Sequence, residues 1–275
     1  MTWVELILPE PEGRTATVRR ATSGPFEVCW VCLSSPARAG GEDSAFLRAE
    51  GDDQLMGFAI DGMGGMARGA EAAQVAATTL ERELARSPGP GSPIQRAVLA
   101  VRQAHAQVIQ RCPGGGATIA GAVFSEGGVQ TLHAGDAEVL VFSGDGACRH
   151  RTPAHSPVGR ALQRGLMDEE QALAHPERHL VSNGLGVVPM SLHLGPRLDL
   201  GAGDTALLAT DGVTDNVREA EVADSLRGAD LPLATAQLTD LCLERMRRSL
   251  TTRTRSPRVG KADDLTLLAI RRTGH

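Results

Sequence analysis

Aspartates that lie beside apolar segments are the residues of this chain best able to do chemistry. Asp61 follows the apolar run 55–60 and begins the sequence Asp-Gly-Met-Gly-Gly at residues 61–65. An acid at a strand end can hold a metal ion, and glycines let the backbone turn sharply and bring its carbonyls close to the ion. The arrangement recurs at three later points, namely Asp136, Asp211 and the pair Asp263–Asp264. We therefore expect these acids to form one carboxylate cluster.

Such a cluster could hydrolyse phosphate esters. Hard divalent cations such as Mg²⁺ and Mn²⁺ take oxygen ligands, usually one or two carboxylates each together with several waters. Two ions about 3.5–4 Å apart can activate a water and orient it in line with a phosphorus atom. Phosphate monoesters require strong help of this kind, since enzymes accelerate their hydrolysis by up to about 10²¹-fold. A phosphate also needs a fork-shaped cation, and Arg38 stands five residues before Asp43.

A simpler interpretation is that these acids are turn residues. Asp-Gly is the strongest short signal of a hairpin turn, and we expect Asp145–Gly146 to be such a turn. Any one of the other aspartates, taken alone, is more readily a turn or cap residue than a ligand. Aspartates at several strand ends, one of them followed by Met-Gly-Gly, are hard to obtain from turns alone.

The first half of the chain has the pattern of strands followed by two helices. Residue alternation and turn residues predict strands at 3–8, 16–20, 26–33, 44–48 and 55–60. A helix with an apolar face over 73–84 follows. The second helix begins at Ser92, where Ser92, Pro93 and Gln95 form a capping box. His105 lies on its apolar stripe, so we expect a packed, hydrogen-bonded histidine there rather than a ligand.

The second half predicts more strands, two more helices and a last strand. Strands are expected at 117–124, 129–134 and 138–142, and glycine-containing links make successive strands antiparallel. A mixed segment at about 157–185, with a polar middle at 166–170, is a candidate mobile flap. The remaining expected elements are a strand ending at Thr210, helices at about 218–227 and 231–250, a basic loop at 253–261 and a strand at 265–270.

This order of elements predicts two sheets and two helical layers. Each sheet must bury one face, and amphipathic helices can cover the other, so we expect a four-layer α-β-β-α sandwich of two mainly antiparallel sheets, an α+β fold. A single core can serve 275 residues, and nothing in the pattern divides the chain. We expect a single domain over 1–275, in which residues 1–22 form an N-terminal extension with edge strands.

Charge and hydropathy exclude several classes of partner. The formal net charge is −5 with both signs interspersed, which gives no electrostatic footprint for nucleic acid and no polybasic membrane patch. No segment offers the roughly 18 apolar residues of a spanning helix, and the N-terminus lacks the basic start of a signal peptide. We expect a cytoplasmic monomer that acts on a protein or a small molecule.

The five cysteines are scattered, without the regular framework of a small secreted domain. Cys29 and Cys32 match the C-x-x-C spacing but lie inside the apolar run 26–33, where side chains alternate between sheet faces. We therefore favour buried structural thiols over a redox or zinc role. Cys242 shares an apolar helix face and is expected in the core.

Taken in order, these motifs resemble those of the bacterial metal-dependent serine/threonine protein phosphatases of type 2C, the PP2C or PPM family. The resemblance runs from about Val28 to Arg271, and its specific parts are the sequences at 61–65 and 210–215, which resemble D-G-M-G-G and S-D-G-L-T-D. The further matches are Arg-x-x-Gly-Glu-Asp-Ser at 38–44, Gly-Ala-Thr at 116–118, Gly-Asp at 135–136 and Asp-Asp-Leu-Thr at 263–266.

The resemblance implies a pair of Mn²⁺ or Mg²⁺ ions in a core site. Asp61 would bridge both ions, and the Gly62 carbonyl would bind one of them. Asp211 and Asp263 would complete the second ion.

It also implies a third, more weakly bound ion, which Asp136 and Asp43 would hold directly or through waters. Arg38 would grip the substrate phosphate. The flap at 166–175 would lie beside the site and influence substrate choice.

The sequence departs from the family pattern at positions that are not expected ligands. Met66 and Ala70 stand where His and Glu are common, Ala137–Glu138 replaces Ser-Arg, and Ala154 replaces the Asp of a frequent D-H-S. Met63 stands where eukaryotic members carry a histidine that is a proposed general acid. These changes leave catalysis plausible and leave the proton donor to the leaving group unassigned, with a water on a metal ion as one candidate.

Two functions of different classes compete. The first is a Mn²⁺- or Mg²⁺-dependent phosphatase that hydrolyses phosphoserine and phosphothreonine in proteins, opposing a bacterial kinase, by attack of water activated by two metal ions. The second is a catalytically silent phosphatase-like domain that binds a phosphoprotein or regulates a partner. Retention of every expected metal carboxylate favours the first. Relatives that act on anti-sigma-factor antagonists often carry sensor domains; the sequence shows none, which favours a free-standing general phosphatase.

Overall fold

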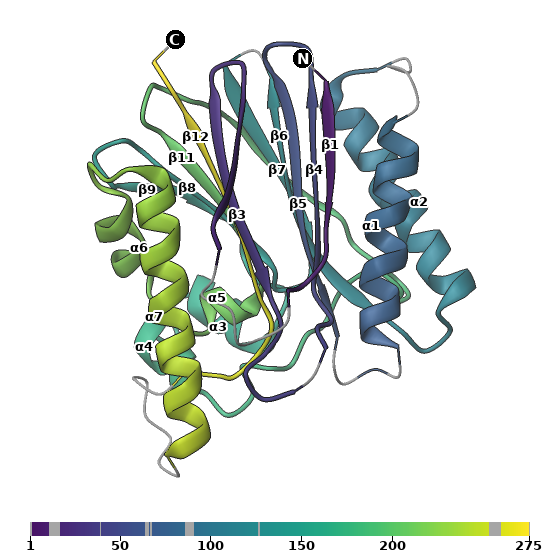
Figure 1. Cartoon of the computed structure of the whole chain (residues 1–275). Helices are drawn as coiled ribbons and strands as arrows, with labels where there is room; N and C mark the ends of the chain where they lie inside the picture. Colours follow the sequence, from purple (N-terminus) through teal and green to yellow (C-terminus); the bar gives the residue numbers. More distant parts are fainter. Residues whose placement is uncertain are drawn as a thin grey trace.

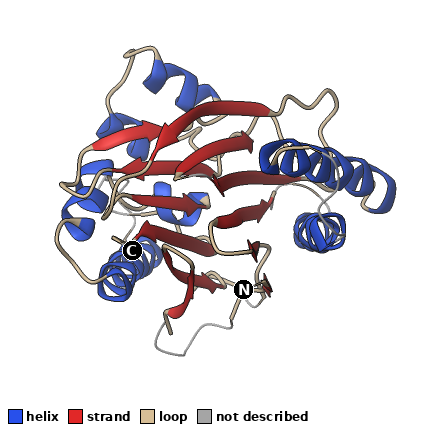
Figure 2. Cartoon of the chain, turned by 90° about the horizontal axis from the view of Figure 1, so that it is seen from above, coloured by secondary structure: helices blue, strands red, loops and turns tan. Residues whose placement is uncertain are grey.

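Two stacked antiparallel sheets form the centre of the molecule, and helices cover their outer faces (Figures 1 and 2). The computed structural model describes residues 2–10, 17–38, 40–63, 66, 68–85, 91–125, 127–252 and 260–274. The first sheet has the strand order β1 (Trp3–Ile7), β4 (Ser44–Glu50), β5 (Gln54–Gly62), β6 (Ala117–Ser125), β7 (Gly128–Ala134) and β10 (His193–Asp199). The second has the order β2 (Arg19–Ser23), β3 (Phe26–Leu33), β12 (Leu265–Arg272), β11 (Thr205–Ala209), β8 (Glu138–Phe142) and β9 (Cys148–Arg151).

Two pairs of helices make the outer layers. Helices α1 (Gly69–Ala85) and α2 (Pro93–Arg111) cover the first sheet, and α6 (Glu219–Leu226) and α7 (Leu231–Thr251) cover the second. The short helices α3 (Pro157–Gln163), α4 (Glu169–Ala174) and α5 (Asp211–Thr214) lie near one end of the sheets, low in the view of Figure 1. The predicted α-β-β-α sandwich is confirmed.

Strand alternation builds three apolar interfaces from these four layers. On β5, Phe58 and Ile60 face α1 and α2, whereas Leu55 and Ala59 face the second sheet. On β12 the faces divide in the same way between the first sheet and helix α7. Because side chains of a strand point alternately to its two faces, each central strand contributes to two interfaces and its register is fixed.

The predicted start of α2 is present in atomic detail. The Ser92 hydroxyl accepts from the Gln95 amide, and the Gln95 side chain accepts from the Ser92 amide at 2.9 Å. These bonds satisfy amides that a helix end leaves without intrahelical partners. On the same helix, His105 is partly buried and its Nδ1 accepts from the Gly186 amide at 3.1 Å, so the expected packed histidine is observed.

Several elements differ from the sequence prediction. The second strand covers Arg19–Ser23 rather than 16–20, because pairing with β3 sets its register up to the turn at Gly24. Strands β9 and β10 were not predicted: β9 has only four residues, and β10 is a largely exposed edge strand with a register shift between Leu194 and Arg197. Helix α5 is a single turn after β11, too short for periodicity to reveal.

The cysteines are structural, as expected. None of the five is bridged, and Cys29, Cys32 and Cys242 are buried. Burial raises the pKa of Cys29 and of Cys242 to about 12, so both stay protonated thiols at neutral pH.

In the ranges that the structure describes, no helix is both long enough and apolar enough to cross a bilayer.

Candidate active site

Acids from both sheets meet at one end of the sandwich. Asp61 lies at the end of β5, Asp136 in the link between β7 and β8, Asp211 directly after β11 and Asp263 just before β12. Together with Asp43, before β4, and Asp215, in the turn after α5, we call them the aspartate cluster. Burial raises the pKa of Asp61 well above its ordinary value, and the charges of Asp211 and Asp43 raise it further. The expected carboxylates are therefore within electrostatic reach of one another.

Close backbone packing makes this convergence possible. The chain after β11 passes against the chain before β12, and a Cβ atom at Gly212 would lie 1.7 Å from the Asp264 carbonyl oxygen. Only glycine fits at position 212, because any side chain would overlap the Asp264 carbonyl. The approach brings Asp211 and Asp263 to the same place.

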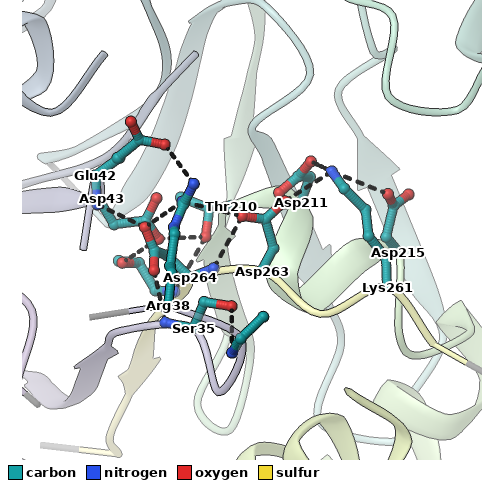
Figure 3. A network of polar contacts seen from close by, with 12 residues as sticks. Ser35, Arg38, Glu42, Asp43, Thr210, Asp211, Asp215, Lys261, Asp263 and Asp264 are labelled. Carbon is teal, nitrogen blue, oxygen red and sulfur yellow. Dashed lines mark hydrogen bonds and ion pairs between the residues drawn. The ribbon is translucent and has the colours of Figure 1, made fainter. Parts of the chain in front are cut away.

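Asp43 links the two sheets at this end. Its Oδ2 accepts a hydrogen bond from the Thr210 hydroxyl at 2.8 Å, at the end of β11 (Figure 3). It accepts another from the Thr266 hydroxyl at 2.7 Å, at the start of β12. Its Oδ1 is buried and has no hydrogen-bond partner among the described residues. One oxygen of Asp43 thus holds the strand ends together, and the other is left for a ligand.

Asp264 holds the arginine of the site in place. Its Oδ1 accepts from the Ser35 amide at 2.6 Å, and its Oδ2 accepts from the Glu42 amide at 2.5 Å and from the Arg38 guanidinium at 2.8 Å. Asp264 is almost fully buried, whereas the Arg38 side chain remains 39% exposed. Asp264 is therefore a clamp for the loop that carries Arg38, and the guanidinium keeps a face toward solvent.

A lysine lies inside the aspartate cluster. Lys261 Nζ donates to Asp211 Oδ2, pairs with Asp263 Oδ2 at 2.9 Å and lies 3.7 Å from Asp215 Oδ2 (Figure 3). Burial lowers the pKa of this lysine, but the charges of Asp211 and Asp215 outweigh burial and raise it.

The remaining carboxylate oxygens fit a hard divalent cation. Asp136 Oδ1 and Asp215 Oδ2 are buried and make no hydrogen bond within the described ranges, although Asp215 Oδ2 lies 3.6 Å from Arg178 and 3.7 Å from Lys261. Burial, followed by the charge of Asp211, raises the pKa of Asp215 to about 7. Buried carboxylates without donors require protons or cations. A set of carboxylate oxygens and a backbone carbonyl is the donor chemistry of Mg²⁺ and Mn²⁺.

A cavity of about 230 Å³ opens beside these acids. Its lining includes Asp136 and Asp215 of the cluster and the apolar side chains of Val158 and Leu162 from α3 and Leu173 from α4. Charged side chains, among them Arg151 and Glu169, also line it. The segment predicted as a flap therefore lies over a cavity that reaches the aspartate cluster.

A second group of possible ligands lies near Asp136. His133, His155 and His193, which we call the histidine cluster, offer nitrogens within 4.8 Å of one another. The rings of His133 and His155 stack with centroids 4.4 Å apart. Burial lowers the pKa of His133 to about 4, and burial together with the charge of His133 lowers the pKa of His155 to about 3. Nitrogens this close together could hold a metal ion, so the positions of the ring hydrogens decide whether a lone pair is available for one.

The hydrogen bonds occupy both ring nitrogens of His155, whereas His133 Nδ1 is buried without a hydrogen-bond partner among the described residues. His155 Nδ1 accepts from the Gly135 amide at 3.0 Å and from the Asn183 side-chain amide at 2.8 Å. The Asn183 orientation is fixed by two bonds to the Ser191 backbone. Since Nδ1 accepts, neutral His155 carries its proton on Nε2 and donates it to His193 Nδ1 at 2.5 Å. The His155 lone pair that would face a metal is therefore replaced by a proton.

This bonding also positions Asp136. The His155 amide donates to the Gly135 carbonyl at 2.9 Å while its ring accepts from the Gly135 amide, so His155 holds both sides of the residue before Asp136. Gly135 has φ +113°, and a Cβ atom there would lie 2.4 Å from Thr118 Cβ. The histidine cluster is thus a support for the aspartate cluster.

Met63 packs away from the acids. A Cβ atom at Gly184 would lie 2.5 Å from the Met63 methyl carbon, and one at Gly116 would lie 3.0 Å from it. Met63 therefore fills the space between the start of β6 and the end of the flap. Gly64 and Gly65, the last residues of the signature motif, lie outside the described residues.

Sequence reasoning missed three residues of the site. Lys261 was assigned to a basic loop, although its being the only lysine of the chain, two residues before Asp263, was a usable signal. Asp215 lies four residues after Asp211, a spacing that places both on one side of a helical turn. Asp264 was quoted in a motif, but its role as a clamp depends on amides of residues far away in sequence.

Comparison with known proteins gives the family and the fold. The profile of the protein phosphatase 2C family matches residues 39–251. The chain belongs to the protein phosphatase 2C family. The serine/threonine protein phosphatase PstP of Mycobacterium tuberculosis is 28% identical over 211 residues, which make up 75% of this PP2C chain and 40% of PstP. The chain thus spans less than half of the length of that relative.

Solved structures show the same fold. The PPM Ser-Thr phosphatase MsPP of Mycobacterium smegmatis, in complex with cacodylate, has a TM-score of 0.71 and 24% identity, over 90% of the PP2C chain and 99% of MsPP. The catalytic domain of the phosphatase PstP in complex with two manganese ions has a TM-score of 0.68 and 24% identity, over 90% and 97% of the two chains. At this identity the likeness establishes the fold.

Proposed function

We propose that this member of the PP2C family hydrolyses phosphoserine and phosphothreonine in proteins, with Mn²⁺ or Mg²⁺ ions held by its aspartates. The observation that carries the proposal is the aspartate cluster itself. Acids from five separate segments lie together, three of them (Asp43, Asp136 and Asp215) with buried oxygens that make no hydrogen bond within the described ranges. An exposed guanidinium lies beside them.

Five of the six carboxylates of the cluster have a proposed role. The groups proposed to hold two ions are Asp61, Asp211, Asp263 and the Gly62 carbonyl, and those proposed for a third ion or its waters are Asp136 and Asp43. Bound there, the ions would neutralise phosphate charge and activate a water for in-line attack on phosphorus. The two manganese ions in the PstP catalytic domain support this assignment.

Arg38 is proposed to bind and orient the phosphate. Asp264 and Glu42 hold its guanidinium, with Nη1 2.7 Å from Glu42 Oε2, so its direction is set before a substrate arrives. A planar guanidinium can give two parallel hydrogen bonds to a phosphate. The cacodylate complex of MsPP supports the proposal, because cacodylate is a tetrahedral oxyanion like a phosphate ester.

The cavity under the flap is proposed to receive the substrate chain next to the phosphorylated residue. Its acidic lining residues belong to the proposed metal site, and its apolar lining residues Val158, Leu162 and Leu173 could contact an uncharged flanking side chain. The proposed substrates are proteins phosphorylated by a bacterial serine/threonine kinase in the cytoplasm.

A second candidate is a catalytically silent domain that binds a phosphoprotein. The position of Lys261 favours it, because an ammonium already contacts two of the proposed metal ligands. Calorimetry separates the two functions: a silent domain would bind a phosphothreonine peptide without releasing phosphate.

The test is phosphate release from a phosphothreonine peptide with Mn²⁺. The wild-type protein should release phosphate, EDTA should stop it, and Asp61→Asn should lower the rate by about 10²–10³-fold, since a bound ion supplies several kcal/mol of charge stabilisation. Equal rates in wild type and Asp61→Asn, or rates independent of Mn²⁺, would contradict the proposal.

A further inference from the structure

Lys261 is the only lysine among the 28 basic residues of the chain, and it lies among the acids of the proposed metal site. Its Nζ contacts Asp211 and Asp263, and the side chain is 22% exposed. Figure 3 shows the side chain reaching between Asp211 and Asp215. A lysine on the surface commonly pairs with one nearby acid, whereas the Lys261 ammonium is largely enclosed by carboxylates.

The backbone fixes this position. Asn216, which is buried, accepts from the Lys261 amide at 3.1 Å and donates to the Lys261 carbonyl at 2.9 Å. The same Asn216 amide group donates to the Gly212 carbonyl at 2.9 Å. Lys261 is thereby tied to α5, the helix that carries Asp211. The ammonium is thus delivered to the cluster by a held backbone rather than by a mobile loop.

An ammonium and a divalent ion compete for the same oxygens. The ammonium carries one positive charge and three donors, and it uses them on Asp211 Oδ2 and Asp263 Oδ2. A Mg²⁺ or Mn²⁺ ion needs those oxygens as direct ligands and is repelled by a positive charge a few ångströms away. Asp61 and Asp136 make no ion pair with Lys261 in the described structure, so the competition concerns one end of the cluster.

We propose that Lys261 takes the place of one divalent ion at the Asp211–Asp263 end of the cluster, so that the chain binds one ion firmly and a second only when the lysine is displaced. The inference rests on the proposed divalent-ion site. It makes the second ion, and any activity that depends on it, responsive to the concentration of free metal.

Titration calorimetry with Mn²⁺ on the metal-free full chain tests this directly. Wild type should bind one equivalent tightly, whereas Lys261→Met should bind two or should bind the second at least about tenfold more tightly. Lys261→Arg keeps the charge and should resemble wild type. Arg178→Gln is the matched control, because Arg178 lies 3.6 Å from Asp215 and its loss removes one positive charge without freeing Asp211 or Asp263.

Thermal melting in EDTA gives a second readout that does not depend on activity. Lys261→Met should melt at a lower temperature than wild type without metal and should gain more from added Mn²⁺, because the carboxylates lose the ammonium that contacts them. Two ions of equal affinity in wild type and Lys261→Met would overturn the role of Lys261 and leave the phosphatase proposal intact. Binding of no Mn²⁺ by either protein would overturn the divalent site and the inference with it.

Discussion

The aspartate cluster and the histidine cluster both collect metal-binding atoms next to the Gly135–Asp136 turn, and they differ in what already occupies those atoms. In the histidine cluster the amides of Gly135 and Asn183 direct the His155 proton toward His193, so the inward lone pair is used. In the aspartate cluster, oxygens of Asp136 and Asp43 have no donor among the described residues, and in the histidine cluster His133 Nδ1 is likewise without a partner there. Ligand types alone therefore do not identify a metal site, because the hydrogen bonds decide which lone pairs are available.

The largest expected effect is the loss of activity in Asp61→Asn, which should not be accompanied by a loss of stability. Asp61→Asn should lower phosphatase activity by about 10²–10³-fold, yet the metal-free protein should melt at an equal or higher temperature. Burial and like charges raise the pKa of Asp61, so replacing this carboxyl by an amide relieves repulsion. The control is Asp145→Asn at an exposed hairpin turn, which should change activity by less than about twofold. A lower melting temperature for metal-free Asp61→Asn would show that the cluster is not repulsive.

The next effect concerns Gly135, where the two clusters join. Gly135→Ala should destabilise the protein by about 1–3 kcal/mol or more and reduce activity, because the residue has φ +113° and no room for a methyl group. Gly165→Ala is the matched control: its φ is +67°, but nothing lies within 4 Å of the added carbon. Urea unfolding should give a clearly smaller loss for Gly165→Ala, and equal losses would mean that the packing around Gly135 is not limiting.

The two clusters should also respond to pH in opposite directions. The pKa of His155 is lowered to about 3, so between about pH 3 and 6.5 the unfolded chain takes up a proton that the folded chain does not, and stability is lost as pH falls. The pKa of Asp215 is raised to about 7, so between about pH 4 and 7 the folded chain keeps a proton that the unfolded chain releases, and stability is lost as pH rises. Each group contributes at most about 1.4 kcal/mol per pH unit.

Urea unfolding in EDTA at several pH values separates the contributions of His155 and Asp215 to the pH dependence of stability. Relative to wild type, Asp215→Asn should make stability rise more steeply with pH between about 4 and 7, and His155→Gln should make it rise less steeply between about 4 and 6.5. Slopes that shift in the same direction in both variants would contradict the contrast between the clusters.

The smallest expected effect is that of His193 on metal affinity. His193→Ala should leave Mn²⁺ affinity within about twofold of wild type, because His193 accepts a proton from His155 and contacts none of the proposed ligands in the described structure. Calorimetry checks this, and a tenfold weaker affinity would show that the histidine cluster binds the metal after all.

Local and repeated signals were predictable from sequence, and long-range hydrogen bonding was not. The capping box at Ser92, the alternating strands and the aspartates at strand ends follow from spacing within a few residues. The function of Asp264 depends on amides of Ser35 and Glu42, more than 200 residues away in sequence. Lys261 was missed for the same reason, because its partners Asp211 and Asp215 meet it only after β12 joins the sheet.

The place of β12 in the second sheet has a consequence for biosynthesis. This strand follows all the other elements along the chain, yet it lies between β3 and β11 in the sheet, and the residues just before it supply Asp263 and Lys261. A nascent chain that has emerged only as far as α7 therefore lacks the central strand that must link β3 to β11, and its carboxylates cannot yet meet. Under the proposed function, a nascent chain would be unable to remove phosphate groups until β12 has emerged from the ribosome, and translation products that stop short of β12 would be inert.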